Sequence, residues 1–66
     1  MEWEDGFCIR CRIDSGAVLL SANREGLRSL AKLLNALAEE APGSHVHLDA
    51  YNALEEDSTE LIVEKK

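Results

Sequence analysis

A run of leucines and alanines between residues 24 and 41 constrains the fold more than any other feature of the chain. Apolar residues recur there at spacings of three and four, which is the period of one face of an α-helix. The members of this stripe are Leu27, Leu30, Ala31, Leu34, Leu37, Ala38 and Ala41. The pattern predicts one amphipathic helix over residues 24–41, whose apolar face must be buried against another element.

The ends of this helix carry their own signals. Asn23 is a favourable N-cap, because its side chain can accept a hydrogen bond from a backbone N–H of the first turn. Pro42 disfavours helical geometry in the residue before it, and Gly43 permits the chain to reverse. Gly26 stands in the first turn, where glycine costs up to about 1 kcal/mol relative to alanine. We therefore expect a close approach at Gly26, either by Trp3 or by a strand backbone.

Four segments around the helix read as strands. Residues 7–13 and 44–51 alternate between apolar and polar side chains, which is the period of a half-buried strand. Residues 17–22 are apolar on both faces, and residues 59–64 direct alternate apolar side chains inward. The turn residues Asp14-Ser15-Gly16 join the first two segments as a three-residue hairpin loop.

The order β-β-α-β-β predicts an α+β fold. A four-stranded, mainly antiparallel sheet would carry the amphipathic helix on one face, an arrangement that antiparallel sheets tolerate. With 66 residues the chain makes a single domain, residues 1–66, and a chain this short has too small a core to enclose a ligand. We expect no cofactor.

Charge and composition restrict the class of partner. The net charge of −6 argues against nucleic acid and anionic membranes, because both are bound through Lys and Arg. An acidic surface instead accelerates encounter with a basic protein. The acidic N-terminus does not resemble a secretory signal, and no window approaches the ~20 apolar residues of a membrane span. These features, with two cysteines that fit a reducing compartment, lead us to expect a cytoplasmic protein.

Two groups of residues could carry chemistry, and both have a plainer interpretation. Cys8 and Cys11 form a C-x-x-C motif, but residues three apart on a strand lie roughly 10 Å apart on opposite faces, too far for joint action. His45, His47 and Asp49 share one face of a predicted strand and could meet a metal ion. A solvated polar face explains the same spacing. No catalytic constellation is present, and we predict that the protein is not an enzyme.

The outward face of the predicted sheet is the best candidate for contact with a protein partner. It combines apolar residues with a polar rim, as contact patches do. Its residues are Arg10, Arg12, Leu19, His45, His47, Tyr51 and Ile62, and an acidic loop adds Glu55, Glu56 and Asp57. A second copy of the chain could cover the same face and form a homodimer.

Three segments resemble the immunity protein 32 family of bacterial polymorphic toxin systems. They are Ser21-Ala22-Asn23 with Gly26-Leu27 and Leu30-Ala31, residues 43–49 (GSHVHLD) and residues 58–63 (STELIV). The resemblance implies a cytoplasmic protein that binds and silences a cognate toxin and has no enzymatic activity of its own. The acidic loop is compatible with a basic toxin domain. The alternatives are a self-associating structural or regulatory module and a small metal-binding protein that uses His45 and His47, with Asp49 or Cys8 as a candidate further ligand.

Overall fold

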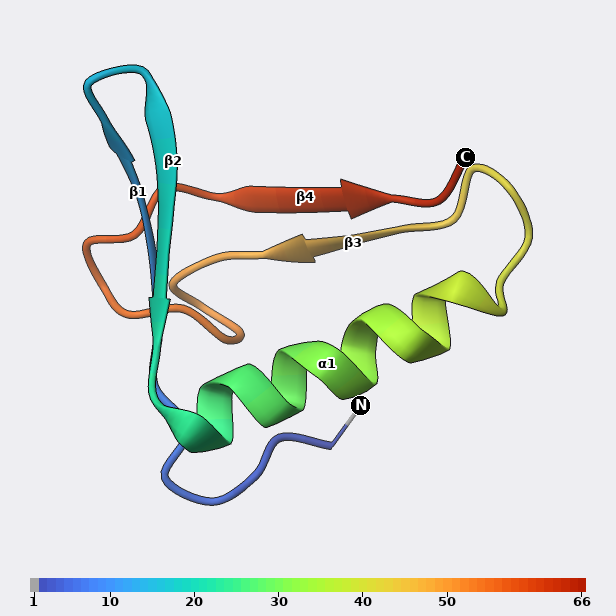
Figure 1. Cartoon of the computed structure of the whole chain (residues 1–66), viewed down its shortest axis with the longest axis horizontal. Coiled ribbons are helices and arrows are strands. Elements are labelled where there is room, and N and C mark those ends of the chain that lie inside the picture. Colours follow the sequence, from blue (N-terminus) through green and yellow to red (C-terminus); the bar gives the residue numbers. More distant parts are fainter. Residues whose placement is uncertain (1) are drawn as a thin grey trace.

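The structure is a computed structural model that describes residues 2–66. Its elements are β1 (Ile9–Asp14), β2 (Ala17–Ala22), α1 (Arg24–Ala38), β3 (His45–Leu48) and β4 (Leu61–Glu64), in the predicted β-β-α-β-β order (Figure 1). The fold is α+β, as the sequence predicts. The helix ends at Ala38, three residues before the predicted end, and Glu39 is its C-cap.

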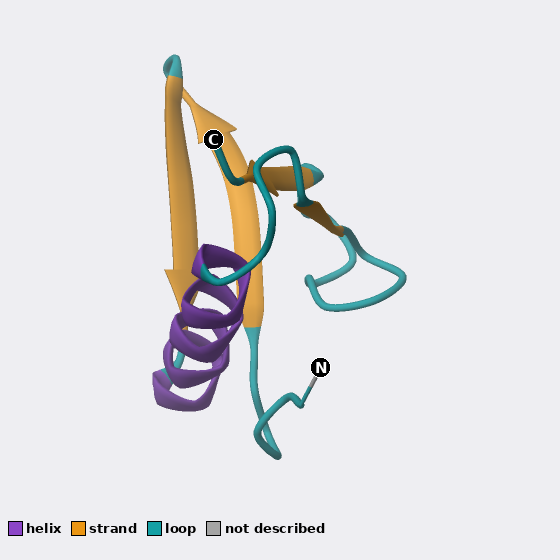
Figure 2. Cartoon of the chain, turned by 90° about the vertical axis from the view of Figure 1, so that its right-hand side faces the viewer, coloured by secondary structure: helices purple, strands orange, loops and turns teal. Residues whose placement is uncertain are grey.

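The prediction of one four-stranded sheet is wrong. The strands form two separate antiparallel pairs, β1 with β2 and β3 with β4. The first hairpin stands at one end of α1, whereas the second runs across the molecule beside the helix (Figures 1 and 2). The second edge of β1 is occupied by the loop before β4: Glu55 N–H donates to Ile9 O at 2.8 Å, and Thr59 N–H donates to Cys11 O at 2.7 Å. Because this loop takes the edge, β4 does not pair with β1.

The turn between β1 and β2 is tighter than predicted. Asp14 pairs with Ala17, so only Ser15 and Gly16 form the loop. Their φ angles are 52° and 83°, both in the left-handed region. Two such residues make the turn whose twist matches that of the flanking strands, and glycine takes the second position without strain.

The helix does not bury the predicted stripe as a whole: of its seven residues only Leu30 and Leu37 are buried, and Ala31, Ala38 and Ala41 are exposed. Leu30, Leu33 and Leu37 are buried, but Leu27 and Leu34 remain 56% and 48% exposed. Gly26, Ser29 and Leu33, which lie outside the predicted stripe, are buried instead, so the helix turns a neighbouring face toward the core. The described core comprises Ile9, Cys11, Leu30, Leu33, Leu48, Ala53 and Leu54, with Trp3, Phe7, Ala22, Val46 and Leu61 packed against it.

Asn23 and Gly26 fix the junction between the first hairpin and the helix. The Asn23 side chain accepts hydrogen bonds from Gly26 N–H at 2.8 Å and from Cys8 N–H at 3.0 Å, which confirms the predicted N-cap. A Cβ on Gly26 would lie 2.7 Å from the Cys8 carbonyl oxygen and 2.9 Å from Ile9 Cγ1. The close approach expected at Gly26 is therefore made by the backbone that enters β1.

The loop between β3 and β4 belongs to the core. Ala53 and Leu54 are buried, and their N–H groups both donate to Asp49 O. This packing holds the loop against β1. Within residues 2–66, no helix has the length and apolar character needed to cross a membrane.

Candidate protein-binding surfaces

The predicted partner-binding residues fall into two groups on different surfaces. Register places Arg12 opposite Leu19 and Arg10 opposite Ser21, so these side chains share the outer face of the first hairpin. With Glu55 they line a shallow groove of about 310 Å³, which we call the β1 groove. Four of the ten predicted residues, Arg10, Arg12, Leu19 and Glu55, therefore come together in one place.

A charge cluster lies at one side of the β1 groove. Arg10 Nε is 3.1 Å from Glu55 Oε2 and 3.1 Å from Asp57 Oδ1, although the N–H is not aimed at either oxygen for a hydrogen bond. The Arg10 and Glu55 side chains are 40% and 39% exposed, so the pair contributes at most about 1 kcal/mol to stability. Arg10 thus neutralises part of the negative charge of residues 55–57. The third carboxylate of this segment, Glu56, is exposed.

Cys8 is joined to the same cluster. Its Sγ donates a hydrogen bond to Glu55 Oε1 at 3.0 Å. This hydrogen bond, loss of hydration and the negative charge of Glu55 raise the pKa of the Cys8 thiol, against an opposing effect of Arg10. Cys11 lies in the core, and both cysteines are free thiols. The C-x-x-C motif therefore contributes one core residue and one protonated surface thiol.

Tyr51 protrudes beside this region. It is 98% exposed and lines a second depression of about 300 Å³ that shares Cys8 and Glu55 with the β1 groove. Asp49 Oδ1 accepts a hydrogen bond from Tyr51 N–H at 2.9 Å, which shapes the turn that presents the ring. An aromatic ring this exposed, next to a groove, is a typical anchor for a protein partner.

The other predicted residues lie on the outer face of the second hairpin. His47 pairs with Ile62, which is 53% exposed, and His45 pairs with Glu64. We call His45, His47 and Ile62 the histidine face. The ring centroids of His45 and His47 lie 5.1 Å apart, and His47 Nδ1 is 3.1 Å from Glu60 Oε2.

A metal site is not formed on this face. Residues 2–66 contain no group of three or more His, Cys, Asp or Glu side chains that could hold a metal ion. His47 instead has a carboxylate neighbour, and His45 Nδ1 lies 3.3 Å from Gly43 O. Both histidine rings therefore have a neighbouring oxygen within the described part of the chain.

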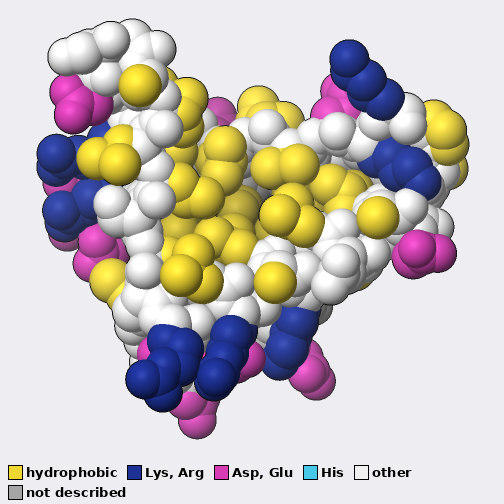
Figure 3. Space-filling model, in the orientation of Figure 1, with side chains coloured by type: hydrophobic (Ala, Val, Ile, Leu, Met, Phe, Trp, Pro, Cys, Tyr) yellow, Lys and Arg dark blue, Asp and Glu magenta, His cyan; other side chains and the backbone are white. Residues whose placement is uncertain are grey.

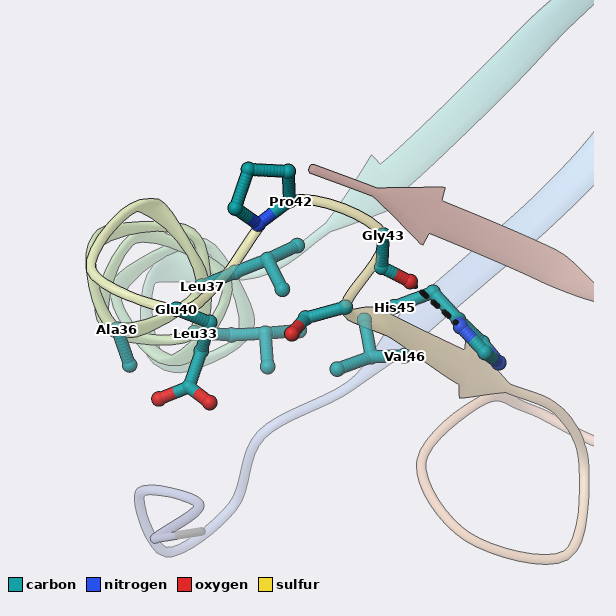
Figure 4. Close-up of a pocket in the computed structure, with 9 residues that line it drawn as sticks. Leu33, Ala36, Leu37, Glu40, Pro42, Gly43, His45 and Val46 are labelled. Atoms are coloured by element: carbon teal, nitrogen blue, oxygen red, sulfur yellow. Dashed lines mark hydrogen bonds between the residues drawn. The ribbon is translucent and has the colours of Figure 1, made fainter. Parts of the chain in front are cut away.

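An open cleft of about 640 Å³ separates the C-terminal end of α1 from β3. Leu33, Leu37 and Val46 point into it, whereas the Glu40 carboxylate and the His45 ring lie on opposite sides (Figure 4). The cleft therefore does not bring these two titratable groups together for acid–base chemistry, which needs groups within hydrogen-bond reach of one substrate.

An apolar hollow on another face was not anticipated from the sequence. It measures about 300 Å³ and lies between β2, α1 and β4. Hydrophobic side chains gather at the centre of this face, and charged side chains stand around its margin (Figure 3). The lining residues are Leu20, Leu27, Leu30, Ala31, Leu33, Leu34, Leu61 and Val63. The sequence signal for it is the predicted helical stripe itself, because its members Leu27, Ala31 and Leu34 line the hollow and are not buried in the core.

The described residues thus form a small α+β protein with surface grooves and an exposed apolar face. The family model of Immunity protein 32 matches residues 17–66, and the chain belongs to this family. The match begins at β2, so β1 lies outside it. No curated protein and no solved structure matches the chain.

Proposed function

We propose that this protein is an immunity protein that neutralises a cognate bacterial toxin by binding it, without catalysis. Membership of the Immunity protein 32 family supports this function. The observation that carries the proposed mode of action is the clustering of Arg10, Arg12, Leu19 and Glu55 in the β1 groove, with Tyr51 beside it.

This surface has the composition of a protein contact. Leu19 is 43% exposed and Tyr51 is 98% exposed, so both can bury apolar area when a partner binds. Arginines and carboxylates surround them, which matches the polar rim that encloses the anchors of protein interfaces. Truncation of a central anchor in such an interface weakens binding about tenfold or more.

The charge of the chain supports a basic partner. The net charge is −6, and the 55–57 segment places three carboxylates next to the groove. Opposite charge on a toxin domain would accelerate capture, and added salt would slow it. We propose a cytoplasmic encounter with a basic toxin domain, encoded by the neighbouring gene.

Co-expression with the toxin tests the proposal. The wild-type chain is expected to restore growth of cells that express the neighbouring toxin gene and to co-purify with its product. Leu19→Asp and Tyr51→Ala should weaken binding at least tenfold, whereas Asn35→Ala, an exposed position on α1, should leave it unchanged. Ile62→Ala reports on the histidine face in the same assay. Growth arrest despite folded immunity protein, with no complex at micromolar concentration, would refute the function.

A further inference from the structure

We propose that two copies of this chain associate through the free edge of β2 and together cover the apolar hollow. The inference goes beyond toxin binding and does not depend on it. It rests on the hydrogen-bonding pattern of β2, on the exposure of one apolar face and on the charges at the two ends of the strand.

The outer edge of β2 is open for pairing. Asn23 N–H donates to Cys8 O at 3.1 Å, and residues opposite each other in an antiparallel pair alternate between bonded and non-bonded positions. The backbone N–H and C=O groups of Val18, Leu20 and Ala22 therefore point away from β1. In the part of the chain that the structure describes, no hydrogen bond reaches these groups. Yet β2 is apolar on both faces, whereas natural edge strands usually carry charges or proline that block pairing.

The inner face of the same hairpin is uncovered. Val18 and Leu20 are 62% and 41% exposed, and Ile13, opposite Val18, is 59% exposed. Leu27 and Leu34 of α1 continue this apolar surface across the hollow (Figure 3). A stable interface buries about 800 Å² per partner, which is roughly one sixth of the 4683 Å² of this chain. The free strand edge, the exposed side chains of Ile13, Val18 and Leu20 and the lining of the hollow would supply this area together.

Symmetry favours a second copy as the occupant. Two β2 strands that pair antiparallel about a two-fold axis place both inner faces on the same side of a joint sheet. The order β1-β2-β2-β1 then carries both helices on that side, because α1 contacts the inner residues Ile9 and Ala22. Each hollow opens toward the other copy.

The charges at the ends of β2 fit the same arrangement. Asp14 is exposed at the turn end, while Arg24 and Arg28 are exposed at the helix end, with Glu25 half-buried between them. Antiparallel pairing sets the turn end of one copy beside the helix end of the other, so the joint strand pair brings opposite charge, rather than like charge, to each of its ends. The six residues of β2 carry no charge, so no like charges meet at the axis.

A matched pair of lysine variants tests the dimer. Val18→Lys places a charge on the inner face and free edge, whereas Ala17→Lys adds the same charge one residue earlier on the outer face. Light scattering should give twice the monomer mass for the wild-type chain at micromolar concentration. We expect Val18→Lys to raise the dissociation constant at least tenfold and Ala17→Lys to change it less than about threefold. Circular dichroism confirms that each variant is folded.

Amide hydrogen exchange on the wild-type chain gives an independent measurement that does not require a variant. The amides of Leu20 and Ala22 should be protected at high protein concentration and exchange rapidly on dilution, while the Leu19 amide, which faces β1, stays protected. A monomer at all concentrations up to about 100 μM would overturn the inference, as would equal effects of the two lysine variants. Protection of the β2 edge only when toxin is added would also overturn it and would assign this edge to the toxin.

Discussion

Gly26→Ala is the substitution whose effect the structure defines most sharply. In an exposed helix, alanine would stabilise the protein by about 1 kcal/mol relative to glycine. At this position the new Cβ would lie 2.7 Å from the Cys8 carbonyl oxygen and 2.9 Å from Ile9 Cγ1. The carbonyl cannot rotate away freely, because it accepts a hydrogen bond from Asn23 N–H at 3.1 Å.

The steric cost of the new methyl group exceeds the stabilisation that alanine gives through its higher helix propensity. Forcing an extra methyl group into a packed site costs typically about 1–3 kcal/mol. Because the new methyl group at Gly26 meets fixed backbone, we expect a cost at the upper end of this range. We expect Gly26→Ala to lower the free energy of unfolding by about 2 kcal/mol. Domains of this size have only about 3–10 kcal/mol in total, so the loss is a large fraction.

Urea unfolding followed by circular dichroism measures this change. For a small domain with an m-value of about 1 kcal/mol/M, the midpoint should fall by roughly 2 M. Asn35→Ala, at an exposed position of the same helix, is the matched control and should raise stability by a few tenths of a kcal/mol. Both variants are compared at one protein concentration. If Gly26→Ala matched or exceeded the wild type, the role assigned to this contact would be wrong.

Three further substitutions address other contacts. Ser29→Ala should cost about 1–2 kcal/mol in urea unfolding, because Ser29 is fully buried and its hydroxyl accepts from Glu4 N–H at 2.9 Å. Asn23→Ala should cost about 1–2 kcal/mol and lower helical circular dichroism, because it removes the N-cap and the acceptor for Cys8 N–H. The raised pKa of Cys8 predicts alkylation by iodoacetamide at pH 8 slower than that of an unperturbed thiol, and Glu55→Ala should accelerate it by lowering that pKa. An unchanged rate in Glu55→Ala would exclude the hydrogen bond as the main cause.

Local patterns predicted the elements well because their causes are local. Within the strands that form, the alternation correctly assigned the faces of the second hairpin: Val46 pairs with Val63 and Leu48 with Leu61 on the inner side, and Ile62 is exposed. The predicted strand 44–51 is too long, since β3 ends at Leu48 and Ala50 is exposed in a turn. The N-cap at Asn23 was equally readable, because one side chain and the following turn determine it.

These local patterns did not predict the long-range packing. The sequence pattern indicates an acidic loop over residues 52–58, yet Ala53 and Leu54 enter the core and bring this loop to the edge of β1. The periodicity of a sequence indicates which residues share a face, but it does not indicate which segment pairs with which strand edge. The prediction of a single four-stranded sheet was wrong for this reason. The same limit applies to α1: the spacing of leucines and alanines predicted the helix, but not that Leu33 enters the core while Leu27 and Leu34 stay exposed.

For the candidate partner-binding residues, too, the sequence predicted the local arrangement but not the long-range contacts. The alternation of strand residues predicted that Arg10, Arg12 and Leu19 share a face, and the register confirms it. Their proximity to Glu55 depends on the path of the loop, which no local pattern specifies. Partner binding by these residues stays a prediction until the toxin assay is made.

The backbone contacts between β1 and the loop before β4 also determine how the chain unfolds. They join Ile9 to Glu55 and Cys11 to Thr59, so the first strand is completed only by residues far along the polypeptide. An isolated two-stranded hairpin is at best marginally stable in water. Neither end of the molecule can therefore melt separately, and heating should produce one all-or-none transition in which both hairpins and the helix are lost together.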